Sequence, residues 1–325
     1  MGRVVLVTGI SRDIGRRFAR AAASDPSIDR VIGVDVVPPR GDIGDVSFIR
    51  ADIRNPVIAK VLAKEDVDTV VHMSVIATPG SAGGRGTMKE LNVIGSMQLL
   101  AACQKSATVE RLVVKSTTTV YGSGPRDPAM FTEDMGPKRL PSSGYAKDVY
   151  EIEGYVRGFA RRRPDVAVTM IRAANVIGPH VVSPLTGYFR LPMIPRVLGF
   201  DPRLQFLHED DLMGVLRHAA LTGIPGTFNV AGDGLMTLSQ AIRRLGTPAI
   251  SMPGFAVGRL GATMRQARLS DFSPEQLGFL TYGRGVDTTR MRTTLGFEPT
   301  FTTAEAFADF CEAVGGRTPA GASRA

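Results

Sequence analysis

Residues 3–35 read RVVLVTGISRDIGRRFARAAASDPSIDRVIGVD, and this stretch decides the fold. Residues 4–8 form a short apolar run of the kind that buried parallel strands show. A turn covers residues 9–15, and apolar residues then recur at helical spacing up to Ala23. A second apolar run, 31–34, ends on Asp35. The order of strand, helix and strand predicts a βαβ unit that binds a dinucleotide at the helix N-terminus.

The turn supplies most of the expected cofactor-binding residues. Glycine lets the backbone approach the phosphates closely, and Gly9 and Gly15 can serve this purpose. A third glycine is expected between them. Depending on the alignment, its position is taken by Arg12 or by Asp13. Asp13 also fits a helix N-cap, and a structural relic of the loop is the alternative interpretation. Asp35 lies 20 residues after Gly15, where an acidic residue accepts from the adenosine ribose. The predicted contacts are Gly9, Ser11, Arg12, Asp13, Ile14, Gly15 and Asp35.

Composition limits the class of protein. The chain has 325 residues, 43% of them hydrophobic, as is ordinary for a globular protein. Its two cysteines, Cys103 and Cys311, lie far apart and suggest neither a disulfide framework nor a metal site. The net charge of +8 comes from scattered arginines, which favours a solvated basic surface over a nucleic-acid site. No apolar run approaches a membrane span and no signal peptide is seen, so we expect a cytoplasmic protein.

Strands and helices continue to alternate after Asp35. Apolar runs at 46–49, 68–73 and 112–116 predict further strands, and helical spacing covers 56–63, 88–100 and about 144–162. A strand at 167–172 follows the last of these helices. This alternation predicts an α/β fold, a Rossmann-type doubly wound parallel sheet covered on both faces, with a smaller α/β C-terminal region.

Nine motifs occur in an order that resembles one family. They are T-G-x(5)-G at Thr8, Asp35, Asp52-Ile53, N-V-x-G at Asn92, S-T-T-T-V-Y-G at Ser116, N-V-x-G-P at Asn175, F-x-H-x-D-D at Phe206, F-N-V-x-G at Phe228 and L-G-F-x-P at Leu295. Together they resemble the extended short-chain dehydrogenases, the NAD-dependent epimerase/dehydratase family typified by UDP-glucose 4-epimerase. The resemblance covers roughly residues 3–310.

The resemblance implies a domain plan and a set of site residues. Residues 1–174 would form the NAD(P)-binding domain, with sheet additions from about 205–232 and 286–290. Residues 175–204 and 233–314 would bind a nucleotide-sugar substrate, and 315–325 would be a disordered tail. Further cofactor contacts would be Asp52, Ile53, Met73, Ser74, Val75, Asn92 and Lys147. Thr117 would bind the reacting sugar hydroxyl, although a hydroxyl there can also cap the strand end. Asn175, Arg190, Arg196 and Arg203 would hold the nucleotide diphosphate.

The chain departs from the family at the acid/base pair, Tyr-x-x-x-Lys. Lys147 and Glu151 fit the family's lysine and the glutamate four residues beyond it, which leaves Ser143 at the tyrosine position. Tyr145 lies about 200° round the helix from Lys147. Aligning on Tyr145 instead puts Val149 at the lysine position, which we regard as the worse match. We therefore take Thr117, Tyr145 and Lys147 as the catalytic candidates.

Three interpretations of this departure stay open. The chain is an oxidoreductase or epimerase whose proton is handled by Tyr145, Tyr121 or the substrate; a non-catalytic NAD(P)(H)-binding sensor or regulator; or a nucleotide-sugar binding protein without turnover. Asp35 would repel a 2′-phosphate and favours NAD, whereas Arg12 resembles an arginine of NADPH-dependent relatives. We expect NAD, no metal, no nucleic-acid partner and a homodimer.

Overall fold

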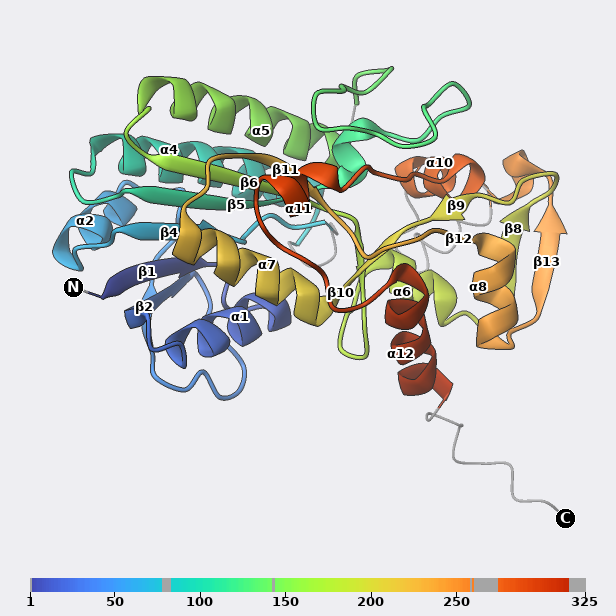
Figure 1. The fold of residues 1–325 in the computed structure, drawn as a ribbon, viewed down its shortest axis with the longest axis horizontal. Helices are drawn as coiled ribbons and strands as arrows, with labels where there is room; N and C mark the ends of the chain where they lie inside the picture. Colours follow the sequence, from blue (N-terminus) through green and yellow to red (C-terminus); the bar gives the residue numbers. More distant parts are fainter. Residues whose placement is uncertain (1, 78–82, 142–143, 258, 260–273, 316–325) are drawn as a thin grey trace, which may run out of the picture.

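A seven-stranded parallel sheet forms the centre of the larger part of the molecule (Figure 1). The computed structural model describes residues 2–77, 83–141, 144–257, 259 and 274–315. The strand order is β11-β6-β5-β4-β1-β2-β3, and every neighbouring pair is parallel. The strands are β1 (Arg3–Thr8), β2 (Ile28–Asp35), β3 (Val46–Arg50), β4 (Thr69–His72), β5 (Arg111–Thr117), β6 (Ala167–Ala173) and β11 (Gly226–Val230).

Helices cover both faces of this sheet. One layer holds α2 (Val57–Lys64), α4 (Gly95–Lys105) and α5 (Gly144–Arg162), and the other holds α1 (Asp13–Ala23) and α7 (Glu209–Thr222) (Figure 1). α3 (Arg85–Lys89) and a π-helical turn, η2 (Glu90–Ile94), lead into α4, and a 3₁₀ turn, η3 (Thr118–Tyr121), follows β5. The predicted α/β doubly wound fold is therefore confirmed.

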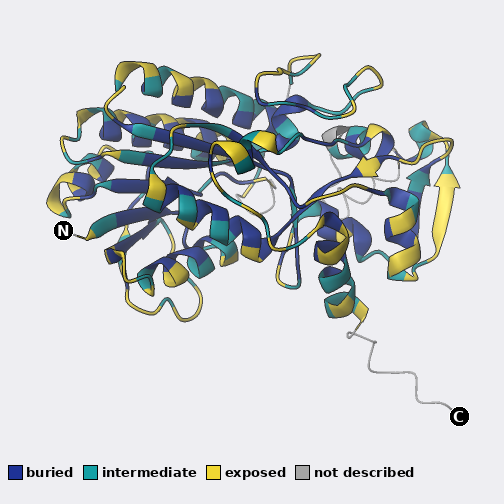
Figure 2. Ribbon diagram, viewed as in Figure 1, coloured by how far each residue is buried: buried dark blue, intermediate teal, exposed yellow. Residues whose placement is uncertain are grey.

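The strand order switches between β1 and β4. From β1 the sheet grows to one side through β2 and β3, and from β4 it grows to the other side through β5 and β6. In open α/β sheets, ligands bind outside the carboxyl ends of the strands at this point. The sheet interior is apolar and dark blue in Figure 2, as two covered faces require. The fold therefore places a ligand site beside the turns that follow β1 and β4.

The sheet additions differ from expectation. Of the described strands that follow β6, β11 alone joins the large sheet, and it lies within the predicted addition at 205–232. β10 (Phe206–His208) pairs instead with β7 (Asn175–Ile177), and Val286 forms an isolated bridge with Phe131. β7, β10 and the bridge at Val286 lie where the chain passes between the large sheet and the smaller region. The part of the predicted tail at 316–325 lies outside the described residues.

A second, separate core organises the smaller region, on the right of Figure 1. It is built on stacked and edge-on aromatic rings, among them Phe189, Phe206, Phe307 and Phe310. The remaining elements are β8 (Ile194–Val197), β9 (Arg203–Leu204), β12 (Met236–Thr237), β13 (Ala249–Met252), α6 (Pro184–Phe189), α8 (Leu238–Leu245), α10 (Pro274–Tyr282), α11 (Thr289–Thr293) and α12 (Thr303–Gly315). Among the described residues, none of the helices is both long and apolar enough to cross a bilayer.

Candidate functional site

The turn between β1 and α1 has room only for backbone at its two glycines. Gly9 has a φ of +84°, and a Cβ there would lie 2.8 Å from Ser74 Cα. A Cβ on Gly15 would lie 2.2 Å from the Gly9 carbonyl oxygen. Both positions therefore require glycine. The turn packs directly against the segment after β4, as the predicted phosphate-binding loop requires.

The start of α1 differs from the sequence prediction. Arg12 precedes the helix in an extended conformation, and no side chain caps it. The prediction that Asp13 is the N-cap is wrong, because Asp13 is the first helical residue and its carboxylate accepts from Arg16 Nη2 at 2.7 Å. Ile14 packs, partly buried, against the main core. Because Arg16 balances its charge, Asp13 does not present an uncompensated anion to the loop.

Asp35 faces this turn from the end of β2. Its Oδ2 accepts from Ser11 N at 3.0 Å and from Ser11 Oγ at 2.6 Å, and its Oδ1 accepts from Val36 N at 2.8 Å. The carboxylate therefore lies beside the loop, where an adenosine ribose is predicted to bind. The same bonds fix the position of Ser11.

Asp52 and Ile53 follow β3 at the same edge of the sheet. The Asp52 carboxylate accepts from Arg54 Nη2 at 2.6 Å and Nε at 3.0 Å, and this bonding lowers its pKa. The Ile53 side chain is buried against Gly95, where a Cβ would lie 2.9 Å from Ile53 Cδ1. Asp52 thus lies in the turn after β3, which Arg54 stabilises, next to the predicted adenine site.

The segment after β4 is held by buried polar groups. Met73 N donates to Thr8 Oγ1, and Met73 and Val75 are buried while Ser74 is partly exposed. Asn92 Oδ1 accepts from Ile76 N at 2.7 Å, and its Nδ2 donates to Ile76 O at 2.8 Å. Asn92 is almost fully buried. It therefore shapes this side of the site by holding the backbone.

Thr117 ends β5 and Tyr121 ends the turn that follows it. Thr117 Oγ1 accepts from Thr119 N at 3.2 Å, so the hydroxyl caps the strand end in this structure. The Tyr121 hydroxyl is buried, donates to Asn229 Oδ1 and accepts from Arg172, and burial raises its pKa. Tyr121 is therefore enclosed in the core, and Thr117 is the residue of this pair that lies at the sheet edge.

The first turn of α5 separates Tyr145 from Lys147. Tyr145 packs against the main core, and burial followed by the Asp148 carboxylate raises its pKa, while the nearby Arg12 guanidinium lowers it. Lys147 is 40% exposed, and its Nζ lies 3.9 Å from Glu151 Oε1. Ser143 lies outside the described residues. Tyr145 thus faces inward against the core, whereas Lys147 extends to the surface.

Packing of α5 sets a register that the sequence alone did not give. Glu153 is buried, accepts from Ser116 Oγ at 2.6 Å, and binds the Arg172 guanidinium through both oxygens, at 3.0 and 2.7 Å. Glu153, and not the partly exposed Glu151, is therefore the glutamate that α5 buries against the sheet. The residue four before Glu153 is the buried Val149, and four before that is Tyr145. The packing thus favours the register that the sequence analysis rejected, with Val149 where the family has its lysine.

Two partly buried cations lie near the carboxyl edge of the sheet, Arg12 before α1 and Lys115 in β5. Arg12 and Lys115 form no side-chain hydrogen bond or salt bridge within the described part of the chain. Burial lowers the pKa of Arg12, with Asp35 and Tyr145 acting in the opposite direction. Burial, assisted by repulsion from Arg12, lowers the pKa of Lys115 to about 8. Sequence analysis missed Lys115, although a lysine inside the apolar run 112–116 was a visible signal.

The structure separates the four predicted substrate residues. Asn175 begins β7 beside Phe206 at the sheet edge. Arg190 packs over the Phe310 ring, and Arg196 donates to Ser239 and Ser251. These two arginines brace the smaller region internally, and Arg203 is the candidate arginine that lines a pocket.

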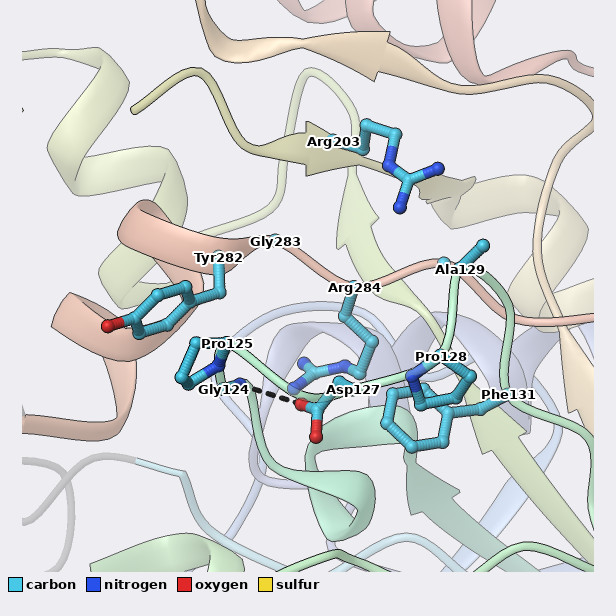
Figure 3. A pocket seen from close by; sticks show the side chains of 11 residues that line it. Gly124, Pro125, Asp127, Pro128, Ala129, Phe131, Arg203, Tyr282, Gly283 and Arg284 are labelled. Atoms are coloured by element: carbon cyan, nitrogen blue, oxygen red, sulfur yellow. Dashed lines mark hydrogen bonds between the residues drawn. The ribbon is translucent and has the colours of Figure 1, made fainter. Parts of the chain in front are cut away.

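That pocket has a volume of about 170 Å³ and lies between the loop after η3 and the end of α10 (Figure 3). Arg203 extends toward it from β9, and Arg284 lies at its base beside Asp127. Arg284 Nη1 donates to Gly122 O at 2.8 Å, and burial lowers its pKa to about 10. Sequence analysis did not single out Arg284, since nothing near it in the chain indicates that it returns to the turn after β5.

Comparison with known proteins gives consistent results. A model of the NAD dependent epimerase/dehydratase family matches residues 5–231. An uncharacterized protein of Mycobacterium tuberculosis is 50% identical over 312 residues, which cover 95% of this chain and 83% of that protein. A UDP-glucose 4-epimerase of Mycolicibacterium smegmatis is 25% identical over 276 residues, 82% of each chain.

Solved structures share the fold. UDP-glucuronic acid 4-epimerase from Bacillus cereus, in complex with UDP-glucuronic acid and NAD, has a TM-score of 0.73 at 19% identity and covers 97% of this chain and 100% of that one. A dTDP-glucose 4,6-dehydratase from Bacillus anthracis, in complex with NAD, has a TM-score of 0.71 at 19% identity and covers 97% of both chains. At this identity the likeness concerns the fold alone.

Proposed function

The chain belongs to the NAD-dependent epimerase/dehydratase family, and we propose that it binds NAD and acts as an oxidoreductase of the epimerase/dehydratase type on a nucleotide sugar. The observation that carries the proposal is the position of Tyr145, which packs partly buried against the main core in the first turn of α5, where burial raises its pKa and Arg12 of the cofactor loop acts to lower it. A phenol beside a fixed cation is the arrangement that this chemistry requires for proton transfer.

The residues present fit a dinucleotide. Gly9 and Gly15 place no side chain at the two closest points of the turn. The first amides of α1 would bind pyrophosphate. Asp35, already beside Ser11, would accept from the adenosine ribose. Arg12 lies at the same turn without an ion-pair partner among the described residues, and its charge suits the pyrophosphate.

Asp35 also supports NAD as the cofactor rather than NADP. A 2′-phosphate would lie close to this carboxylate and be repelled by it. Arg12 does not remove this conflict, because its guanidinium is also within range of Tyr145 and Lys115.

Proton transfer is assigned to Tyr145. Bound NAD would supply the acceptor and donor of hydride. Tyr145 would take the proton of the reacting sugar hydroxyl, and Arg12 would stabilise the phenolate that forms. Thr117 would exchange its bond to Thr119 N for one to the sugar hydroxyl. Because burial and Asp148 both raise the pKa of Tyr145, we expect slow turnover at neutral pH.

A nucleotide sugar is supported by the arginine-lined pocket. Arg203 lines the pocket, its guanidinium makes no hydrogen bond or ion pair with the described residues, and it can pair with a diphosphate. Arg284 adds positive charge at the base. Asn175 lies at the same end of the sheet and would contribute an amide to the substrate.

The alternative, a non-catalytic NAD(P)(H)-binding sensor or regulator, is favoured by one observation. Val149 occupies the position where the family has a lysine, so the site lacks the cation that normally lowers the tyrosine pKa from the same helix. Such a protein would bind the dinucleotide and leave nucleotide sugars unchanged.

Turnover of UDP-hexoses by the wild-type protein and by Tyr145→Phe tests the proposal. The wild type should turn over slowly, and Tyr145→Phe should lower the rate about 100-fold, the scale of general acid–base catalysis, with NADH affinity unchanged. Tyr150→Phe, on the same helix, serves as the matched control. Binding of NADH with no turnover by the wild type would establish the non-catalytic alternative, and an undiminished rate in Tyr145→Phe would place the base elsewhere.

A further inference from the structure

Position 149 leaves the proposed site without its expected cation. Val149 is buried one turn beyond Tyr145, and Glu153 fixes this register through Ser116 and Arg172. Lys147 cannot fill the position, because it extends to the surface beside Glu151. An ammonium for this part of the site must therefore come from another element.

Lys115 on β5 has the right position. Side chains alternate along a strand, and Ser116 faces α5 because it donates to Glu153. Lys115 and Thr117 therefore share the opposite face of β5, the side of the sheet that α1 and α7 cover. Lys115 lies two residues before Thr117, which ends the strand at the site.

Arg12 connects Lys115 with Tyr145. Its guanidinium is close enough to affect the ionisation of both groups. The loop after β1, the end of β5 and the first turn of α5 all lie at the carboxyl edge of the sheet, because parallel strands end there and α5 leads back from it. Lys115 is partly buried, and its ammonium makes no hydrogen bond or ion pair in the described part of the chain. An unpaired ammonium there costs stability unless an anion or hydroxyls complete the site.

We propose that Lys115 contacts the nicotinamide half of the dinucleotide and supplies, from strand β5, the cation that position 149 lacks. Its ammonium would donate to hydroxyl oxygens of the nicotinamide ribose, a contact that the family's lysine makes from α5. This inference rests on the proposed NAD binding and deepens it by assigning a cofactor-contacting residue.

Calorimetric titration with NADH and with ADP tests the inference. ADP carries adenosine and both phosphates but lacks the nicotinamide ribose. Lys115→Met should therefore weaken NADH about tenfold, the loss of one charge-assisted hydrogen bond, and leave ADP affinity unchanged. The variant should melt at the same temperature or higher, because it removes an unpaired, partly buried charge. Lys105→Met, an exposed lysine in the last turn of α4, is the matched control and should change neither affinity.

Val149→Lys provides the rescue. Added to Lys115→Met, it should restore most of the NADH affinity, while added to the wild type it should change that affinity less than twofold. Such non-additivity shows that both positions serve the same part of the ligand.

Two outcomes would overturn the assignment while the proposed function stands: full NADH affinity in a folded Lys115→Met variant, or equal weakening of NADH and ADP. If the wild-type protein binds neither NADH nor NAD, the proposed function fails, and the assignment of Lys115 falls with it.

Discussion

Asp35 shows how one side chain can serve the fold and the ligand together. Its Oδ2 holds Ser11 through both the amide and the hydroxyl, so the carboxylate that would read the ribose also fixes the loop beside it. Such a carboxylate is preorganised, because little rotamer freedom remains to be lost when ligand binds.

Replacing Asp35 by alanine should therefore weaken NAD by roughly 1–3 kcal/mol, the cost of removing a charge-assisted acceptor. Calorimetry on the wild type and Asp35→Ala measures the difference. Ser11→Ala is the control, since it frees the carboxylate without removing it and should cost less. Equal affinity in Asp35→Ala and wild type would mean that the adenosine ribose lies elsewhere.

Arg12 takes a place where related loops have glycine, and the structure explains why the turn accepts it. Arg12 adopts an extended backbone, which every residue type allows, whereas Gly9 has the positive φ and Gly15 the close contact. Only two of the glycines are therefore required by geometry. The third position is free to carry a side chain, and here it directs a guanidinium into the site.

For α5, the sequence predicted the extent of the helix but not which of its residues face the sheet. Apolar spacing gave its extent correctly, and the structure has Gly144–Arg162. Its register over the sheet depends on Glu153 meeting Ser116 and Arg172, which come from two strands far apart in the chain. The spacing of residues within the helix does not reveal contacts to distant strands. Lys147 and Glu151 therefore looked like the better match to the family's lysine and glutamate.

The strands of the sheet were predictable for the opposite reason. Each is a short apolar run bounded by a turn, which is local information. The two-stranded pairing of β7 with β10 and the return of Arg284 to the turn after β5 depend on chain crossings between the two cores. These crossings decide the substrate side of the site, and that side was the least predictable.

At the junction of β4 and α4, His72 should make stability depend on pH. It is buried between Thr8 Oγ1 and Ser96 Oγ, each at 2.8 Å, and burial lowers its pKa to about 4. The folded protein holds the neutral ring, so this contribution is full above the unfolded pKa near 6.5 and is lost as pH falls toward 4.

Urea unfolding should therefore show about 2 kcal/mol less stability from this group at pH 5 than at pH 7. The measurement compares wild type with His72→Gln at both pH values, so that titration of the other groups cancels. The variant should lose this part of the pH dependence. An identical pH dependence in both proteins would show that the pKa of His72 is the same in the folded and the unfolded state.

On the scale of the whole molecule, the two cores are separately packed and the candidate site lies along the carboxyl edge that joins them. The cofactor loop, β5 and α5 belong to the first core, and Arg203 belongs to the smaller region. This division suits an enzyme that holds a dinucleotide on one part and a sugar nucleotide on the other. A homodimer stays a prediction, which sedimentation can measure.

The central claim is that this chain binds NAD through the turn after β1. A native mass spectrum of the purified full-length protein, alone and after addition of NAD, tests it most directly. We predict a species heavier than the polypeptide by the mass of one NAD per chain, and its loss in Asp35→Ala at the same NAD concentration. A spectrum that shows the bare polypeptide alone under both conditions would contradict the account.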